Sequence, residues 1–330
     1  MKKKIILVAA IFIIALLFAA CKKESVSDIT IVLDWLPNTN HTGVYAASSL
    51  GYFADEGLNV NIIQPPEDGA LLLTASGVAQ FCFEYQESLG PALANQSDAM
   101  PLIAVAAVIN HNTSGFMSLK ESGIKSARDM ENKRFASLET SFSDAIVKNI
   151  VEGDGGDFSK VSMISNNAID AFSALRTEVD LYWSFYAWDG VNAEINNIDI
   201  NFIDLAKTNP LFDWYTPILI ANSNFAKTNP ATVKKFMRAV SRGYQYAIEH
   251  SDDAAEILVK NVPELESKII SASQKYLASR YQGDAPRWGE IDSSRWRNFY
   301  KWMFAQGLLN RDLGSETSDQ DTGFTNEFLP

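Results

Sequence analysis

Apolar and polar positions follow two alternating patterns along the 330-residue chain. Short runs of β-branched and other apolar residues are typical of buried strands, and apolar residues spaced three or four apart are typical of helices. Strands are predicted at 29–33, 58–63, 79–84, 102–109, 115–119, 134–137, 161–164, 181–185, 198–204 and 216–221. Helices are predicted at 67–76, 87–95, 141–152 and 168–176, and again from Pro230 onward. This alternation predicts an α/β fold with parallel sheets that carry helices on both faces.

The positions after the first predicted strand carry a high density of hydrogen-bonding groups: Asp34, Trp35, Asn38, Thr39, Asn40, His41 and Thr42. Pro37 fixes one φ angle and ends the strand. A helix capped by Asn40 or Thr42 is predicted to follow and to end at Gly51. Open α/β sheets bind ligands where strands end and helices begin. An ordinary turn with a buried Trp35 explains the indole and the proline but not the other polar groups, so a ligand site is predicted here.

Residues 1–20 have the pattern of an export signal, with lysines at 2–4, an apolar run over 5–18 and small residues before Cys21. The segment LFAAC at 17–21 resembles a bacterial lipobox, in which the cysteine is lipidated after cleavage. Phe18 stands where leucine is usual, and an ordinary signal peptide is the alternative. Residues 21–27 are predicted to form a tether. We therefore expect an extracytoplasmic protein anchored to the cell membrane, in the periplasm or at the cell surface, through Cys21.

The composition limits the class of partner. The chain has 28 Lys and Arg against 40 Asp and Glu, and without the three signal lysines its net charge is −15. Such an acidic chain argues against nucleic-acid partners. Apart from Cys21 the only cysteine is Cys82, in an apolar run, so we expect a buried thiol and no disulfide. The three histidines are scattered and nothing has metal-ligand spacing, so neither a metal nor another cofactor is expected.

Three further polar stretches lie at predicted strand ends: Glu84–Ser88, His111–Gly115 and Ser137–Ser143. Tyr85 and Ser114 are the candidate ligand groups of the first two, where a solvated turn or a plain linker is an equally good explanation. In the third, Thr140 is a candidate, although capping of the helix that follows explains its hydroxyl better.

A fourth stretch, 182–189, combines aromatic rings on both faces of a predicted strand with a carboxylate. Planar rings stack on planar ligands, and a carboxylate accepts hydrogen bonds from ring amino groups. Tyr186, Trp188 and Asp189 are therefore predicted to contact a ligand. The aromatic residues at 296–303 have helical spacing instead and are predicted to belong to the core.

The segments DWLPNTNHTGVYAA, GYFADEGLNV, INHNTSGF, AWDGV and FTNEFLP, together with the Tyr215–Pro217 strand, carry a family resemblance. They resemble the substrate-binding proteins of bacterial ABC transporters in the thiamine-pyrimidine-precursor family. The resemblance covers essentially the whole mature chain. It implies the type II periplasmic binding protein fold, in which two α/β lobes joined by two crossing strands close over the ligand. Residues 28–113 and 221–330 would form lobe 1, and residues 114–220 lobe 2.

The resemblance also implies a function, which is capture of a thiamine-related aminopyrimidine for salvage, with an ABC permease and ATPase as partners. Trp35, Tyr186 or Trp188 would stack on the ring. Asn38 and Asp189 would form hydrogen bonds with the ring nitrogen and the amino group. His41 or Tyr85 would add a polar contact. The other candidate site residues are Asp34, Ser114 and Thr140. Riboflavin-binding and sulfonate- or nitrate-binding components are the alternatives. A site for a small anion would need Arg or Lys side chains, which the five candidate stretches lack. Riboflavin would use the same kinds of contact as an aminopyrimidine and would differ mainly in the size of the cleft it needs.

The family also includes the fungal pyrimidine synthase, which carries a cofactor lysine and a sacrificial histidine four residues apart. An ungapped reading places Glu84 and Ser88 at those positions. A carboxylate forms no Schiff base and a hydroxyl cannot donate imidazole atoms. Pyridoxal phosphate chemistry also belongs inside the cell. We therefore expect a binding protein and not an enzyme.

Overall fold

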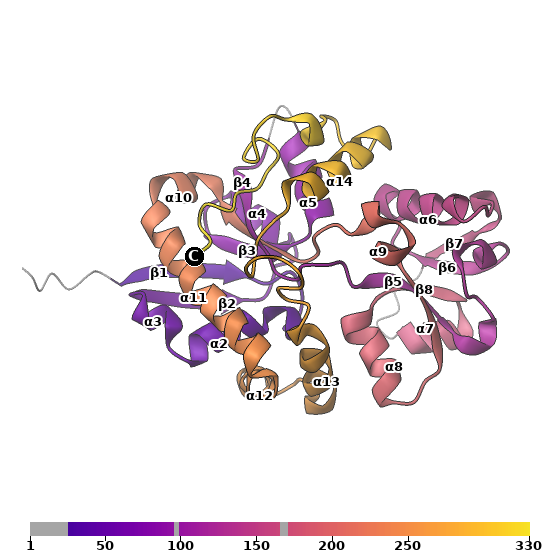
Figure 1. Ribbon diagram of the computed structural model, residues 1–330, viewed down its shortest axis with the longest axis horizontal. Coiled ribbons are helices and arrows are strands. Elements are labelled where there is room, and N and C mark those ends of the chain that lie inside the picture. The colour runs from indigo at the N-terminus through magenta and orange to yellow at the C-terminus, as the bar shows by residue number, and fades with distance from the viewer. Residues whose placement is uncertain (1–25, 96–98, 166–170) are drawn as a thin grey trace, which may run out of the picture.

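The computed structural model describes residues 26–95, 99–165 and 171–330, and its strands form two five-stranded sheets (Figure 1). In spatial order the first sheet contains β2 (Leu58–Ile63), β1 (Ser27–Val32), β3 (Phe81–Glu84), β10 (Ile218–Asn222) and β4 (Leu102–Ala107). The second contains β7 (Ser162–Ser165), β6 (Arg134–Ser137), β8 (Leu181–Phe185), β5 (Ser114–Leu119) and β9 (Ile200–Asp204). The predicted signal peptide and most of the tether, including Cys21, lie outside the described residues.

Both sheets are mixed, so the prediction of parallel sheets is wrong for two strands. β1 runs parallel to β2 and β3, but β10 runs antiparallel to β3 and β4. In the second sheet β5 runs antiparallel to β8 and β9. Each reversed strand follows a segment that arrives from the other sheet. The reversed strand therefore begins at the side of the sheet where the neighbouring strands end, and it pairs with them in antiparallel orientation.

Two segments connect the sheets. Residues 108–113 join β4 to β5, and residues 205–217 join β9 to β10 (Figure 1). Because Ser114 begins β5 and pairs with Phe185, both lie at the edge of the second sheet that is nearest the first. Ile218 and Glu84 occupy the corresponding edge of the first sheet. The polar stretches predicted from the sequence thus lie at two facing sheet edges, while the lobe boundaries stay a prediction.

Helices pack on both faces of each sheet, as the sequence predicts. One face of the first sheet, with Ile31 and Phe83, packs on α2 and α11, and its other face, with Val32, packs on α5 and α14. The second sheet lies between α6 and α7. The helices are α2 (Thr42–Ser49), α3 (Tyr52–Asp55), α4 (Ala70–Ala75), α5 (Gln86–Ala94), α6 (Ser141–Gly153), α7 (Ala171–Thr177), α8 (Val191–Ile195), α9 (Leu205–Thr208), α10 (Ser223–Thr228), α11 (Pro230–Glu249), α12 (Ser251–Asn261), α13 (Ser267–Ala278) and α14 (Ser293–Ala305).

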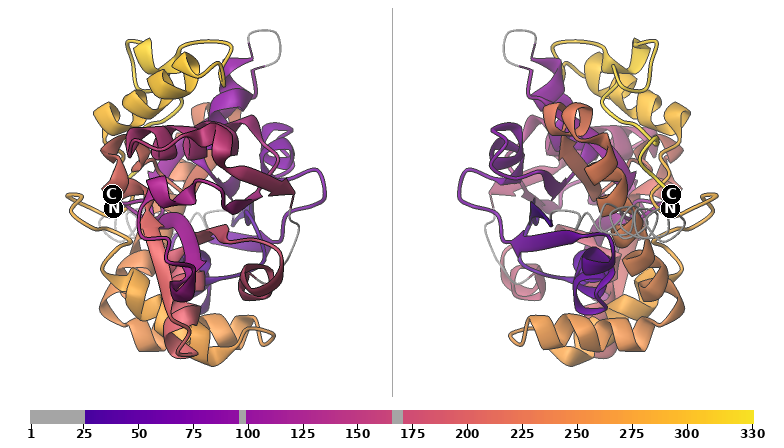
Figure 2. Two further views of the ribbon diagram at one scale, coloured as in Figure 1. Left: turned by 90° about the vertical axis from the view of Figure 1, so that its right-hand side faces the viewer. Right: turned by 90° about the vertical axis from the view of Figure 1, so that its left-hand side faces the viewer.

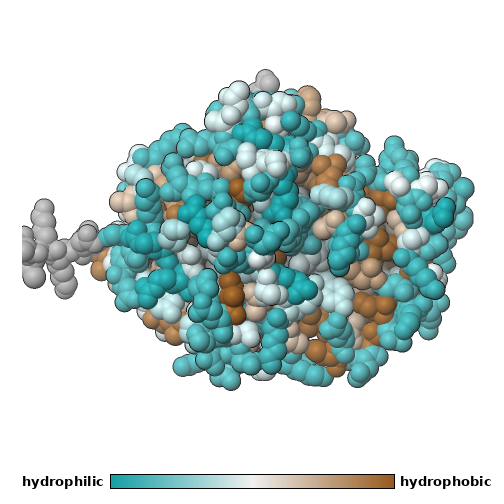
Figure 3. Space-filling view, viewed as in Figure 1, coloured by the Kyte–Doolittle hydropathy of each residue, from teal (hydrophilic) through white to brown (hydrophobic). Residues whose placement is uncertain are grey.

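The helical C-terminal part is confirmed, with Pro230 at the first position of α11. Helices α12 and α13 lie at the bottom of the molecule and the segment around α14 at its top, as viewed in Figure 2. The aromatic residues at 296–303 and Cys82 are buried, as predicted, whereas Phe304, near the end of α14, is exposed. The face seen in Figure 3 is mostly hydrophilic with separate apolar areas. Among the described residues, no helix is long and apolar enough to cross a membrane.

Candidate ligand-binding site

The loop after β1 is organised by His41. Its Nε2 lies 2.5 Å from Asp34 Oδ1, and its Nδ1 accepts a hydrogen bond from the backbone N–H of Asn38 at 3.1 Å. Because Nδ1 is an acceptor, Nε2 carries the proton that is donated to Asp34. Both side chains are buried. The loop therefore holds a carboxylate in a fixed position at the end of the first strand.

Asp34 keeps its negative charge although it is buried. Burial alone raises its pKa, but the interaction with the His41 ring and a hydrogen bond from Tyr85 outweigh this effect, so that the net pKa lies below the ordinary value. The structure thus brings together three predicted site residues, Asp34, His41 and Tyr85, on neighbouring strand ends.

Asn38, and not Asn40 or Thr42, caps the helical segment that follows. A 3-10 helix, Thr39–His41, precedes α2, and the Asn38 side-chain oxygen accepts a hydrogen bond from the Asn40 N–H at 2.8 Å. Its amide nitrogen donates to the Leu36 carbonyl at 3.0 Å. The predicted cap was wrong because the extra 3-10 turn starts the helical segment three residues before α2. Recognition of a ligand ring by Asn38 stays a prediction.

Two further carboxylates, Glu84 and Glu87, lie at the end of β3 and in the helix that follows it. Burial raises the pKa of Glu84 to about 7, with the Asp34 charge adding to the shift. Burial also raises the pKa of Glu87 to about 8, although its carboxylate accepts a hydrogen bond from the Trp214 indole N–H at 2.8 Å. From this stretch, sequence reasoning selected only Tyr85 as a site residue. The acidic pair on either side of Tyr85 was the available signal.

On the second sheet, Ser114 and Thr140 have different environments. The Ser114 hydroxyl is buried and has no hydrogen-bond partner in the described part of the chain. Thr140 Oγ1 accepts a hydrogen bond from the Ser143 N–H at 3.1 Å and caps α6. The capping interpretation of Thr140 is therefore confirmed, and a ligand contact by its hydroxyl stays a prediction.

Apolar side chains gather at the facing sheet edges. Eight large apolar side chains are exposed in the described ranges, and four of them follow or end strands that point at the space between the sheets: Trp35 (65% exposed), Leu36 (60%), Leu138 (55%) and Phe185 (38%). Exposed apolar side chains at these edges are available for contact with a ligand or a partner. The sequence does not identify Leu138 and Phe185 as site residues, because an apolar residue at the end of a strand is expected in any sheet.

The aromatic side chains of the turn at 186–189 pack against the C-terminal helices α12 and α13. β8 ends at Phe185, and residues Tyr186–Gly190 form a π-helical turn. The Tyr186 ring stacks on Tyr276 at 5.3 Å and its hydroxyl donates to Glu194 at 2.6 Å. Trp188 packs against apolar residues of α12 and α13, and Asp189 is half-buried in the same turn. Stacking of Tyr186 or Trp188 on a ligand, and a ligand contact by Asp189, stay predictions.

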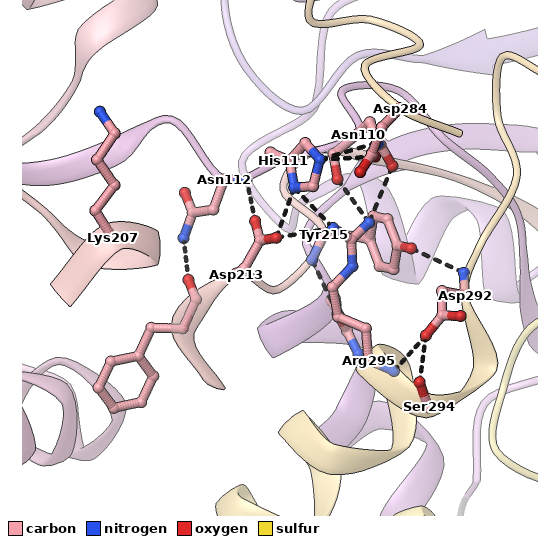
Figure 4. Close-up of polar contacts among 12 residues, drawn as sticks. Asn110, His111, Asn112, Lys207, Asp213, Tyr215, Asp284, Asp292, Ser294 and Arg295 are labelled. Carbon is pink, nitrogen blue, oxygen red and sulfur yellow. Dashed lines mark hydrogen bonds and ion pairs between the residues drawn. The ribbon is translucent and has the colours of Figure 1, made fainter. Parts of the chain in front are cut away.

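A separate cavity of about 860 Å³ lies where the two connecting segments meet the C-terminal part. In its lining, His111 Nδ1 lies 2.6 Å from Asp213, His111 Nε2 lies 2.9 Å from Asp284, and Arg295 donates to Asp213 at 2.8 Å (Figure 4). The hydrogen bond to Asp213 raises the pKa of His111, and burial opposes this effect only in part. This network ties both connecting segments to residues that follow α13.

A family model described as NMT1/THI5 like matches residues 38–254, about two thirds of the chain. The chain belongs to this family. It is 28% identical over 322 residues to the formylaminopyrimidine-binding protein of Halalkalibacterium halodurans, covering 92% of this chain and 95% of the relative. It is also 24% identical to the 4-amino-5-hydroxymethyl-2-methylpyrimidine phosphate synthase THI5 of Saccharomyces cerevisiae, covering 92% and 88%. The relatives therefore include a binding protein and an enzyme.

A solved structure supports the fold alone. The aliphatic sulphonate binding protein SsuA of Escherichia coli superposes with a TM-score of 0.67 at 14% identity, covering 87% of this chain and 89% of that one. The NMT1/THI5-like protein described here thus has the two-lobed periplasmic binding protein architecture implied by its sequence.

Proposed function

We propose that the chain is the extracytoplasmic substrate-binding component of an ABC importer and that it captures a thiamine-related aminopyrimidine. The observation that carries the proposal is the pairing, at the facing sheet edges, of a buried carboxylate group with exposed apolar side chains. Asp34 and Glu84 lie at neighbouring strand ends, and Trp35 and Phe185 lie exposed on opposite edges. This combination suits a flat ring that carries N–H donors.

Each part of the ligand has a matching group. Ring amino hydrogens would donate to the carboxylates of Asp34 and Glu84, where burial makes charge-assisted hydrogen bonds strong. The ring faces would contact the exposed indole of Trp35 and the ring of Phe185. A sulfonate or nitrate would meet carboxylates that repel it, so anion-binding components are the weaker alternative.

Catalysis is not part of the proposal. Glu84 accepts hydrogen bonds from the Tyr85 backbone and from Ser88, and neither side chain can form the aldimine that a pyridoxal phosphate enzyme needs. In the described residues, no group of three or more His, Cys, Asp or Glu side chains is arranged to hold a metal ion. We also propose that Cys21 carries a lipid that holds the protein at the outer face of the cell membrane, beside its permease and ATPase.

A thermal-shift screen of the mature protein tests the proposal. The compounds are 4-amino-5-hydroxymethyl-2-methylpyrimidine, formylaminopyrimidine, riboflavin and taurine. A ligand that binds only the folded state raises the melting temperature by mass action. We expect a shift with the two pyrimidines. A shift with taurine alone would overturn the proposal, and a shift with riboflavin alone would replace the aminopyrimidine by the flavin.

A further inference from the structure

Ser273, on α13, joins two segments that the fold brings from different sheets. Its hydroxyl oxygen lies 2.7 Å from the hydroxyl oxygen of Thr39 and 2.5 Å from the carbonyl oxygen of Ala187. Both serine and threonine are buried. Thr39 belongs to the 3-10 helix after β1, and Ala187 belongs to the π-helical turn after β8.

The direction of the two hydrogen bonds follows from their chemistry. A carbonyl oxygen only accepts, so the single hydroxyl proton of Ser273 is donated to Ala187. Ser273 then accepts the proton of Thr39. The result is a directed chain of two hydrogen bonds from the Asp34–His41 loop, through α13, to the turn that carries Tyr186, Trp188 and Asp189.

The surroundings fix this chain at both ends. The Thr39 carbonyl accepts a hydrogen bond from the Tyr281 hydroxyl at 2.6 Å, which holds the loop against the C-terminal part. On the other side, Lys268 donates to the Ile195 carbonyl at 2.9 Å, and Tyr276 stacks on Tyr186. Helix α13 lies between α12 and α8 (Figure 1) and contacts both. Of these contacts between α13 and the second-sheet part, only the hydrogen bond of Ser273 is fully buried, and the same hydroxyl also contacts the loop after β1.

We propose that Ser273 is a positioning residue that latches the turn after β8 to the loop after β1. The latch forms only when the two sheets are close together, because one hydroxyl has to reach both segments. The importance of this latch for binding rests on the proposed function, because the two segments that Ser273 joins are those that would hold the ligand. Ser273 itself need not touch the ligand.

The test compares Ser273→Ala with two other variants. Thr74→Val is the matched control, because the Thr74 hydroxyl is also buried but its contacts, with the Ala70 carbonyl of its own helix and with Cys82 on β3, stay within the first-sheet part. Thr39→Ser is the conservative variant, because it keeps the hydroxyl that donates to Ser273. A purely structural role of the Ser273 hydroxyl would lower the melting temperature of Ser273→Ala and Thr74→Val alike and leave the distance between the sheets unchanged.

The readout is the distance between spectroscopic labels at Val78→Cys, beside β3, and Glu121→Cys, after β5, with buried Cys82 left in place. In the ligand-free protein we expect Ser273→Ala to populate longer distances than wild type, with Thr74→Val and Thr39→Ser matching wild type. Coinciding distributions for Ser273→Ala and wild type would overturn the latch, whatever the ligand is. With 4-amino-5-hydroxymethyl-2-methylpyrimidine as probe, Ser273→Ala should also release it about tenfold faster. Failure of wild type to bind this probe would count against the proposed function and leave the distance test intact.

Discussion

The His41 ring donates from Nε2 to the Asp34 carboxylate at 2.5 Å while its Nδ1 accepts from the backbone of the same loop. One buried side chain thereby fixes both the shape of the loop and the position of the charge at the end of β1. The remaining contacts of the candidate site are arranged around that charge, because Tyr85 bonds to it and Glu84 lies near it.

Replacing His41 by leucine should destabilise the protein strongly. The change keeps the volume but leaves the Asp34 carboxylate buried without its main partner, and breaking a buried pair in this way costs about 3–5 kcal/mol. Urea denaturation at pH 7 measures the loss. The double variant Asp34→Asn/His41→Leu should be more stable than His41→Leu alone, because it removes the unpaired charge. Equal or lower stability of the double variant would contradict this account of the pair.

Glu87 should make the protein less stable as the pH rises. Its pKa is raised from an ordinary 4.5 to about 8, so the folded state binds the proton more tightly than the unfolded state. The stabilisation is complete below pH 4.5 and is lost as the pH rises toward 8, by about 1.4 kcal/mol per unit of pKa difference. Glu87→Gln should therefore flatten this slope in urea denaturation at pH 5, 6.5 and 8. Exposed Glu264→Gln is the control and should keep the wild-type slope.

His111 should contribute a second pH dependence at the connecting segments. Its pKa is raised above the ordinary 6.5 by Asp213 and Asp284, so its stabilising contribution is complete below pH 6.5 and is lost at higher pH (Figure 4). The ring is half exposed, which makes the contribution small. His111→Gln should lower stability more at pH 5.5 than at pH 8.5. An equal loss at both values would show that the charge of His111 plays no part.

Trp35 and Asp189 should affect binding more than folding. Trp35 is 65% exposed, so Trp35→Ala removes little packing, and a lost stacking contact weakens aminopyrimidine binding by about 1–3 kcal/mol. Asp189→Ala should weaken binding on the same scale if the carboxylate reads the ring amino group. Isothermal titration of each variant, with circular dichroism as a check on folding, measures the effect. Wild-type affinity in both folded variants would place the site elsewhere.

The sequence predicts much of this fold because its strands are short apolar runs with clear ends. The strands at 134–137 and 181–185 and the start of α6 at Ser141 agree with the structure. The direction of β5 and β10 could not be predicted from residue patterns, since a reversed strand has the same apolar run as a parallel one. It depends on the path of the two connecting segments.

The candidate site was predictable only where one local segment forms it. Asp34 and His41 are seven residues apart and their contact follows from one loop, whereas Ser273 reaches that loop from more than two hundred residues away. Nothing in the helical spacing of α13 distinguishes Ser273 from an ordinary core serine. The same limit explains why the sequence predicts a Tyr186 ring free to stack on a ligand, since its partner Tyr276 lies 90 residues away in the chain.

Equilibrium titration of the mature protein with 4-amino-5-hydroxymethyl-2-methylpyrimidine tests the central claim most directly. We predict saturable binding of one molecule per chain, weakened in Trp35→Ala, with the compound recovered unchanged afterwards. The matched titrations use riboflavin and taurine. Binding of taurine without binding of the pyrimidine, or conversion of the pyrimidine to another compound, would contradict the account.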